Sequence, residues 1–490
     1  MVYAKNFPLL IILILFISAF AMLLIKKEVL AKIWSLSTMG VCTLLAFFTV
    51  MDVKTNGSYI YRVGHWDAPW GVEFQIGFVE AIMAILFTSV AMCVIWYSTY
   101  NIEKEIKNTR VPLYYLLINI LMGALLGIVF SNDLFNCFVF IEISTLASCG
   151  IIVIKDKKEN IAATMKYLVL SSLGSGLVLM GTAFLYSITG NLNMTAIHQE
   201  IFAVYGTYKN TLLISLALFT VGLGVKSAMF PLHVWLPDAH SNAPSSSSAL
   251  LSAVVLKAFV LLLIKILYRI FGFEIIREFA ILDLILILGS VGMLMGSIFA
   301  IRQKEIKRVI AYSSVAQMGY IFFGIGLGNE LGVAMAIFHI IGHAVTKSAL
   351  FLAAGAMIEK TGKKEVKELR GIGKEMPITL GIFTMGALSM VGIPILPGFI
   401  SKWHLALASI ERGELILIGT ILLSSLLNAI YYFPIVINGY FGEENLKGKI
   451  YKVKEKPIKE LTPVLLLIGG MIFAGVVSRQ IINMIRVGLV

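Results

Sequence analysis

The feature that most constrains this chain is a series of apolar runs, each long enough to cross a lipid bilayer. A transmembrane helix needs about 20 consecutive apolar residues, and the 490-residue chain is 58% hydrophobic but only 14% charged. The runs lie near residues 7–25, 31–51, 75–99, 112–130, 133–154, 163–189, 211–235, 244–271, 279–301, 306–327, 330–358, 376–410, 414–441 and 461–485. We therefore predict an all-α polytopic membrane protein with about 14 transmembrane helices and no large soluble domain.

Charge and cysteine usage argue against several other classes. The formal net charge is +12, but basic residues of a membrane protein collect in its cytoplasmic loops, so we expect no nucleic-acid partner. The four cysteines are scattered without a C-x-x-C pair, and no haem-attachment, Walker or glycine-rich dinucleotide motif occurs. We therefore expect no cofactor and no metal site in this chain, and no catalytic chemistry by this chain alone.

The basic residues also predict which side each loop faces. With both termini outside, 26 of the 40 Lys and Arg residues fall in cytoplasmic loops and nine in outer loops, while five lysines lie within apolar runs. The cytoplasmic groups lie within residues 26–32, 104–110, 155–166, 302–308, 360–374 and 447–459. The positive-inside rule therefore predicts that both termini are outside.

One outer loop, residues 59–74, alternates polar and apolar residues around a turn. Such alternation predicts a short β-hairpin. The alternative is an irregular loop anchored at the membrane surface by Trp66 and Trp70.

Six charged residues are predicted to lie inside the membrane: Glu142, Lys226, Lys257, Lys265, Lys347 and Lys402. Each costs about 2.5–3.5 kcal/mol at the bilayer centre unless it is partnered or hydrated, and such residues usually mark ion or proton pathways. Glu142 could pair with one of the lysines. Lys265 lies close to the end of its run, where the alternative is that its side chain reaches the membrane surface.

Two of these lysines lie beside interrupted helices. Pro231 follows Lys226, and Pro394 and Pro397 precede Lys402 in a run that is too long for one straight helix. Proline frees a backbone carbonyl, which at membrane depth must be satisfied by protein or water. Paired interruptions in two halves of a chain indicate a transport site. Spans four to eight and nine to thirteen each hold five helices, and an odd number of spans would invert the second half.

Histidines extend the line of titratable groups. His339, His343 and Lys347 recur every four residues and predict a stripe about 12 Å long on one helix face. His233 follows Lys226 by seven residues and lies on the same face if the helix continues. A zinc site or a satisfied core pair are alternatives, but no carboxylate or thiol lies near the histidines on their helix. A proton relay fits imidazole, whose unperturbed pKa is near 6.5.

The stretch from Pro237 to Pro244, which includes His240, precedes four serines on the predicted cytoplasmic side. Asp, His and Ser together resemble a hydrolase set. Because no strand–turn nucleophile elbow precedes them, we interpret the stretch as a loop and a helix cap.

At these residues the chain resembles the antiporter-like subunits of respiratory complex I and of Mrp-type cation/proton antiporters. The resemblance rests on KSAMFPLHVWLPDAHSNAPSSSSALLSAVVLK at 226–257, RVIAYSSVAQMGY at 308–320, HIIGHAVTKSALFLAAGA at 339–356, GIPILPGFISKW at 392–403 and SNDLFNCFVFIEIS at 131–144. It covers essentially the whole chain. A lysine at 402, and the chain's ending after fourteen spans, make it most similar to the Mrp D-type antiporter component and its counterparts in membrane-bound hydrogenases and related archaeal complexes.

The resemblance implies fourteen helices with two inverted five-helix repeats, each with a broken helix. We expect residues 1–110 to form helices one to three and the hairpin, 111–275 and 276–442 the two repeats, and 443–490 a cytoplasmic loop and the last helix. The family roles carry over as Glu142 for the ion-pair partner, Lys226 for the switching lysine, Lys257 for the central relay and Lys402 for the terminal group. His233, His339, His343 and Lys347 match the connecting relay.

The implied function is proton translocation by one subunit of a multisubunit ion-pumping complex in a prokaryotic plasma membrane. Its partners would be other membrane subunits, including hydrogenase-like or other redox subunits, and its cargo protons, with sodium left open. Two other classes compete: a membrane-integral redox enzyme subunit with a quinone or metal site, and a scaffold that transports nothing.

Overall fold

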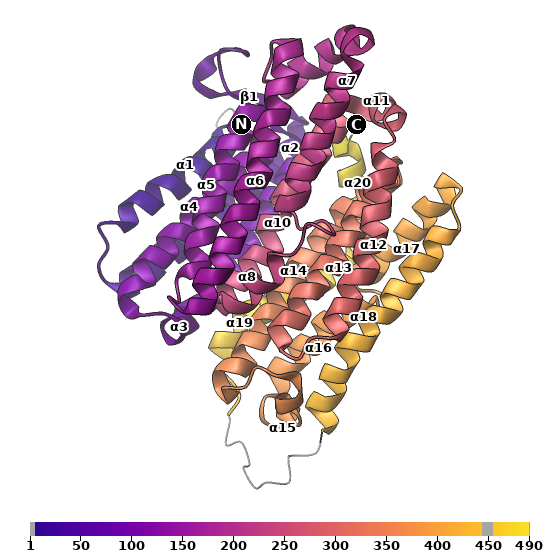
Figure 1. The fold of residues 1–490 in the computed structure, drawn as a ribbon. Coiled ribbons are helices and arrows are strands. Elements are labelled where there is room, and N and C mark those ends of the chain that lie inside the picture. The colour runs from indigo at the N-terminus through magenta and orange to yellow at the C-terminus, as the bar shows by residue number, and fades with distance from the viewer. Residues whose placement is uncertain (1–4, 443–453, 490) are drawn as a thin grey trace.

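The computed structural model describes residues 5–442 and 454–489, which form an almost entirely helical bundle (Figure 1). Within these residues twelve helices are long and apolar enough to cross a membrane, and α1 (Phe7–Met22) and α16 (Pro377–Val391) are shorter apolar helices. The prediction of a polytopic helical membrane protein is confirmed. Lys447, Lys449 and Lys452 of the predicted cytoplasmic loop lie outside the described residues.

Eleven of the twelve candidate spans are single helices, ordered along the chain as the apolar runs predict. They are α2 (Glu28–Asn56), α3 (Phe78–Glu105), α4 (Val111–Phe130), α5 (Leu134–Val153), α6 (Lys158–Thr189), α7 (Met194–Lys226), α12 (Ile281–Ile301), α13 (Ile306–Gly326), α14 (Glu330–Thr361), α18 (Ile416–Phe441) and α19 (Ile458–Val476). The twelfth, Ser245–Glu278, is built from α9 (Ser245–Leu250), α10 (Leu256–Lys265) and α11 (Gly272–Glu278). Shorter helices are α8 (Leu236–Asn242), α15 (Ile372–Glu375), α17 (Pro397–Arg412) and α20 (Ser478–Leu489).

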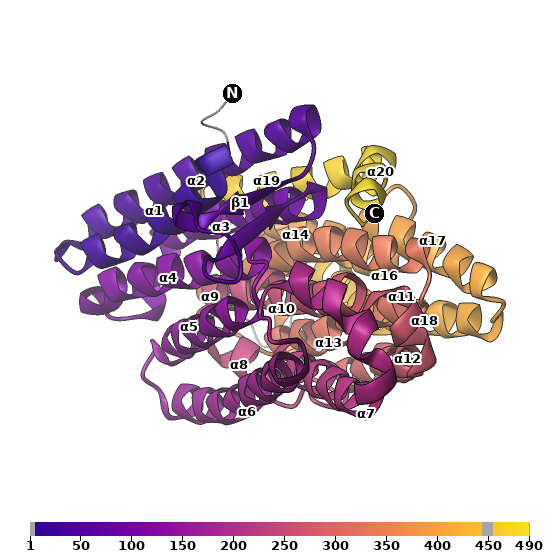
Figure 2. The same cartoon turned by 90° about the horizontal axis from the view of Figure 1, so that it is seen from above.

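Two helical segments run through the middle of the bundle, where Figure 2 shows α10 and α14 enclosed by the other helices. The most apolar windows of Ser245–Glu278 and of α14 are wholly buried inside the protein. In contrast, α2 and α18 bury only 33% of theirs. Charged residues within these buried stretches, such as Lys257 and Lys347, therefore face protein rather than lipid.

Small residues let some helices approach closely. Gly319 of α13 lies against α12, where a Cβ atom at this position would be 2.5 Å from the backbone nitrogen of Met293. Contacts between small residues are a common basis of helix association in membranes, because they allow backbones to pack against each other.

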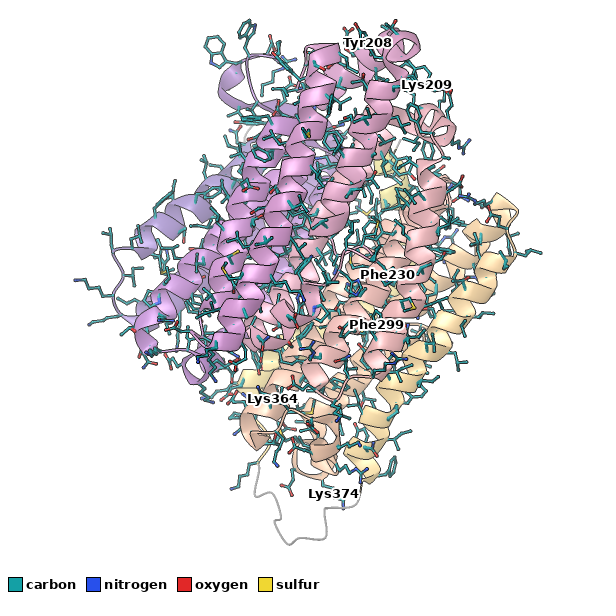
Figure 3. The ribbon with its side chains drawn as sticks, viewed as in Figure 1. Tyr208, Lys209, Phe230, Phe299, Lys364 and Lys374 are labelled. Carbon is teal, nitrogen blue, oxygen red and sulfur yellow. The ribbon has the colours of Figure 1, made fainter. Side chains whose placement is uncertain are left out.

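The predicted outer and cytoplasmic loops lie on opposite sides of the bundle. Figure 3 places Tyr208 and Lys209 at one end of the helices and Lys364 and Lys374 at the other. The hairpin, the start of α1 and the end of α20 share the end that carries Lys209 (Figure 1). We call this end the hairpin side.

The predicted hairpin is confirmed. Strands β1 (Tyr59–Arg62) and β2 (Glu73–Ile76) pair antiparallel, with Tyr59 opposite Ile76 and Arg62 opposite Glu73. Trp66 and Trp70 belong to the segment that connects the two strands, and both side chains are exposed.

Two predicted runs differ from the observed helices. The run 461–485 is not one helix, because α19 ends at Val476 and α20 is a separate amphipathic helix whose Ile482 and Ile485 are buried. The run 211–235 is also divided. Helix α7 begins earlier, at Met194, and ends at Lys226.

Both predicted helix breaks are present, and in each a non-glycine residue has a left-handed backbone. After α7 this residue is Ala228, with φ 56°, and between α16 and α17 it is Ile395, with φ 77°. The carbonyls at the C-terminal ends of α7 and α16, which precede the breaks, accept hydrogen bonds from protein side chains, as their burial requires. The indole of Trp235 donates to the Val225 carbonyl at 2.9 Å, and the Lys402 ammonium donates to the Met390 and Val391 carbonyls at 2.8 and 3.0 Å.

The central helix containing Lys257 is also irregular. Two π-helical segments, Leu251–Val255 and Ile266–Phe271, flank α10. Such segments occur frequently at functional sites.

Candidate functional site

The five predicted intramembrane lysines are all buried in protein. Their exposed fractions range from 0% for Lys257 and Lys347 to 5% for Lys402. Lys265 is 2% exposed, so the alternative that its side chain reaches the membrane surface is wrong. The helical backbone that carries it ends at Gly272, where φ is 73° and ψ is 163°, close to the end of the predicted run.

Glu142 and Lys226 face each other across α5 and α7 but do not form an ion pair. Lys226 is close enough to Glu142 for their charges to interact, yet its ammonium donates instead to the Thr145 hydroxyl at 2.6 Å. The Oε1 atom of Glu142 is buried and has no hydrogen-bond partner within the described part of the chain. The geometry is that of a separated acid–lysine pair.

Thr145 was not predicted as a site residue. It lies three residues after Glu142 and therefore on the same face of α5. Its hydroxyl donates to the Ile141 carbonyl at 2.8 Å, which leaves the oxygen lone pairs for the lysine. The only sequence signal was this spacing.

Lys257 lies at the centre of the titratable groups. Its ammonium donates to the Ser252 carbonyl in the preceding π-helical segment, and Ser252 hydrogen bonds to Ser314 of α13 at 3.0 Å. His339, His343 and Lys347 all lie within electrostatic range of Lys257. The structure therefore joins the α10 lysine to the predicted stripe on α14.

The α14 stripe has the expected geometry. The rings of His339 and His343 stack with centroids 6.1 Å apart, and His339 Nδ1 hydrogen bonds to the Ser401 hydroxyl at 2.8 Å. Three ring nitrogens of this pair, His339 Nε2 and both of His343, have no partner among the described residues. Buried polar atoms are rarely unpartnered, so these nitrogens are available to water or to a transferred proton.

Lys347 and Lys402 extend the line at its two ends, Lys347 next to His343 and Lys402 near His339. Lys347 donates to the Ser313 hydroxyl, to the Ile310 carbonyl at 3.0 Å and to the Tyr432 hydroxyl at 3.3 Å. Lys402 lies over the Tyr320 ring, 4.8 Å from its centroid, and within electrostatic range of His339.

His233 is placed apart from this line. The helix ends at Lys226 instead of continuing, so the condition under which His233 would share a face with Lys226 is not met. The imidazole stacks on Phe230, 5.2 Å between centroids, and packs near Phe299 and Tyr312. Figure 3 shows Phe230 and Phe299 near the middle of the bundle.

His240 occupies the position expected for a relay group, although its segment was interpreted from the sequence as a loop and cap. It is 0% exposed, and neither ring nitrogen has a partner within residues 5–442 and 454–489. Lys257 and Lys347 lie within electrostatic range of it. The available signal was its position between two intramembrane lysines, Lys226 and Lys257.

A cavity of about 430 Å³ opens on the side opposite the hairpin. It is lined by Glu105, Lys155, Lys307 and Ser245, among others. The Glu105 carboxylate accepts from the Ser245 backbone N–H at 3.0 Å and so caps the helical segment that leads to Lys257. Ser241 and Asn242, which directly follow His240, also line this cavity.

The zinc alternative gains no support from the geometry. Within the described ranges no three His, Cys, Asp or Glu side chains cluster in a way that could hold a metal ion.

These features define a class: a polytopic helical membrane protein with two broken helices and a buried line of lysines and histidines. Residues 131–428 match the family described as NADH:quinone oxidoreductase/Mrp antiporter, TM. The chain is 34% identical to the N subunit of the NADH-quinone oxidoreductase of Desulforudis audaxviator, over 86% of this chain and 85% of the relative. It is 31% identical to the D-type component of the Na(+)/H(+) antiporter of Alkalihalophilus pseudofirmus, over 97% of this chain and 95% of the relative.

Solved structures agree with the sequence comparisons. One chain of the membrane-bound sulfane sulfur reductase, described as an archaeal respiratory membrane complex, matches with 28% identity and a TM-score of 0.87, over 98% of this chain and 96% of that chain. A chain of the Mrp complex from Dietzia sp. has the same fold, with a TM-score of 0.89 and 21% identity. The match covers 100% of this chain and 97% of that chain. This chain belongs to the NADH:quinone oxidoreductase/Mrp antiporter family and is one of its antiporter-like membrane subunits.

Proposed function

We propose that this chain moves protons across a prokaryotic plasma membrane as one subunit of a multisubunit ion-pumping complex. The observation that carries the proposal is the buried line in which Lys257 lies within electrostatic range of His240, His339, His343 and Lys347. Ionisable residues buried in a membrane protein usually belong to ion or proton pathways.

In this proposal Glu142 and Lys226 form the switch. When the pair closes, the carboxylate holds the Lys226 ammonium; when it opens, Lys226 moves to Thr145 and can release its proton. Hydrogen bonds to charged groups contribute about 1.5–3 kcal/mol, and one charge crossing 100 mV costs about 2.3 kcal/mol. Opening or closing the pair is therefore of the right size to gate one proton.

The released proton would pass through water to Lys257, the central relay. His339, His343 and Lys347 would connect Lys257 to Lys402, the terminal group. We add His240 to the relay on the cytoplasmic side. His233 stays a predicted member whose connection would need water, since its ring is enclosed by aromatic side chains.

Transport by the reconstituted complex tests this assignment. Proton movement into vesicles is measured with a pH-sensitive dye for Lys226→Ala and Glu142→Ala, with Lys209→Ala as the control because Lys209 pairs with Glu278 at the surface. We expect both pathway variants to lose transport and the control to retain it. Wild-type rates in both pathway variants would reject the proposal.

The partners we propose are other membrane subunits. The relatives' names indicate two drivers: an ion gradient in the Na(+)/H(+) antiporter, and a redox reaction in the respiratory complexes. Mass spectrometry of the complex purified through this chain decides between them, since a hydrogenase-like or other redox subunit would identify a redox-driven complex. The family assignment favours transport over a quinone- or metal-dependent reaction in this chain.

We further propose that the hairpin side faces outwards, with both termini. The excess of basic residues on the opposite side supports this orientation. Tyr208→Cys and Lys374→Cys, at opposite ends in Figure 3, should react with an impermeant thiol reagent from outside and from the cytoplasm respectively. The reverse pattern would invert the topology.

A further inference from the structure

Of the five lysines predicted to lie inside the membrane, Lys265 is the one that the proposed relay does not use. It follows Lys257 by eight residues on α10, about 12 Å along the helix axis, in the direction of the hairpin side. Its ammonium donates to the Val129 and Ser131 carbonyls, both at 2.8 Å. These carbonyls lie at the C-terminal end of α4, where the helix dipole favours a positive charge.

A buried acid and an arginine continue the line beyond Lys265. Arg269, one turn further along, donates to the Glu80 carboxylate at 2.7 Å. Glu80 is 0% exposed, and its second oxygen accepts from the Gly77 N–H at 3.0 Å. Lys265 lies within electrostatic range of Glu80, so the carboxylate is shared by two cations.

This cluster reaches a polar cavity of about 530 Å³ on the hairpin side. Arg269, Gln75, Asn132, Thr195 and His198 are among its lining residues. Asn132 directly follows Ser131, which binds Lys265. Its side chain is 0% exposed, and its Oδ1 atom has no hydrogen-bond partner among the described residues. An unpartnered amide oxygen on a polar cavity indicates a place for water.

We propose that Lys265, Glu80 and this cavity form a proton outlet from Lys257 to the hairpin side within this subunit. The inference rests on the proposed function. The Lys265 ammonium first gives a proton to the Glu80 carboxylate, and protonated Glu80 releases it past Arg269, which lines the cavity, to water there. The neutral Lys265 amine then takes a proton from the Lys257 ammonium through intervening water, which leaves Lys257 neutral. Each step transfers one proton, and together the steps return Lys265 and Glu80 to their starting charges.

Replacing Lys265 by arginine distinguishes a proton-carrying role of this lysine from a purely structural one. Arginine at 265 would still present a positive charge to the α4 carbonyls, but guanidinium does not deprotonate in proteins. A lysine that only caps α4 is therefore replaceable by arginine, whereas a lysine that carries protons is not.

The test compares Lys265→Arg with Lys209→Arg in the vesicle assay of the assembled complex. We expect proton transport to fall at least about tenfold in Lys265→Arg and to stay at the wild-type rate in Lys209→Arg. Wild-type transport by an assembled Lys265→Arg complex overturns the outlet. If Lys265→Arg does not assemble, Glu80→Gln replaces it, because glutamine still offers an oxygen to Gly77 or Arg269 but accepts no proton. Loss of transport then supports the outlet, and wild-type transport overturns it.

A second measurement does not depend on assembly of a pathway variant. Thr195→Cys should react with an impermeant thiol reagent from the hairpin side above the background of the unsubstituted chain. Absence of this reaction overturns the outlet, because the cavity would then be closed to water. Lys226→Ala in the same assay separates the two proposals. If it loses transport while Lys265→Arg does not, only the outlet fails; if it transports normally, the proposed function fails.

Discussion

The Lys226 ammonium of α7 lies 2.6 Å from the Thr145 hydroxyl of α5. It is not paired with Glu142, which lies one turn before Thr145 on α5. Thr145 therefore offers the lysine a neutral acceptor when it leaves the carboxylate. A charged lysine without any acceptor would be costly at this depth. We infer that the hydroxyl stabilises the open arrangement of the pair and thereby favours proton release.

Replacing Thr145 by valine should slow proton transport about tenfold or more. Valine has nearly the shape of threonine but accepts no hydrogen bond, and a hydrogen bond to a charged group contributes about 1.5–3 kcal/mol. Without it the lysine stays with Glu142. The rate is measured in vesicles containing the assembled complex.

Thr145→Ser is the matched control, since it keeps the hydroxyl and should keep most of the transport. Ser144→Ala removes a neighbouring hydroxyl that bonds only within α5, to the Ile141 carbonyl, and should have no effect. Equal rates in Thr145→Val and the wild type would contradict the role of Thr145.

His240→Gln should reduce proton transport by at least about tenfold. Glutamine preserves a polar side chain of similar length but has no titratable group near physiological pH, whereas both imidazole nitrogens of His240 are unpartnered beside Lys257. The control is His404→Gln, because His404 Nδ1 bonds to the Ile400 carbonyl of its own helix at 2.8 Å. An equal effect of the two substitutions would argue against a specific role for His240.

The spans, the hairpin and the charged positions could be predicted from the sequence because each depends on local properties. Hydrophobic length, alternation and proline position determined them directly. The predicted breaks at Pro231 and at Pro394–Pro397 were correct for this reason. The separation of α20 from α19 was missed, since an apolar average over 461–485 conceals an amphipathic segment.

Contacts between helices could not be predicted in the same way. His233 was expected to share a face with Lys226 only if α7 continued, and the left-handed backbone of Ala228 ends that helix. His240 and Thr145 were missed because their importance depends on Lys257 and Lys226, which reach them from other helices. The carbonyls of Val129 and Ser131 that hold Lys265 were likewise not predicted, because they belong to the end of another helix.

Tyr432→Phe should reduce transport about threefold to tenfold. The Tyr432 hydroxyl bonds to Ser313 at 2.7 Å and accepts from Lys347 at 3.3 Å, so its loss removes one of the groups that position the Lys347 ammonium. A typical hydrogen bond contributes about 0.5–1.5 kcal/mol, which corresponds to this range. Tyr431→Phe is the control, because the Tyr431 hydroxyl bonds to Asn428 instead. A larger effect of Tyr431→Phe would contradict the assignment.

Gly319→Ala should destabilise the packing of α13 against α12 by about 1–3 kcal/mol, the usual cost of overpacking. The new methyl group would meet the backbone of α12, including the Met293 nitrogen at 2.5 Å and the Gly289 carbonyl oxygen at 2.8 Å. Backbone atoms cannot move aside as the end of a flexible side chain can. The measurement is the thermal unfolding midpoint of the purified protein, which should fall.

Gly419→Ala on α18 separates packing from helix propensity. Both positions are helical, so alanine gains about 0.8–1.0 kcal/mol of intrinsic helix propensity at each, but a Cβ atom at Gly419 meets nothing within 4 Å. Gly419→Ala should therefore leave the midpoint unchanged or raise it slightly. If both variants behave alike, the close approach of α12 and α13 does not limit stability.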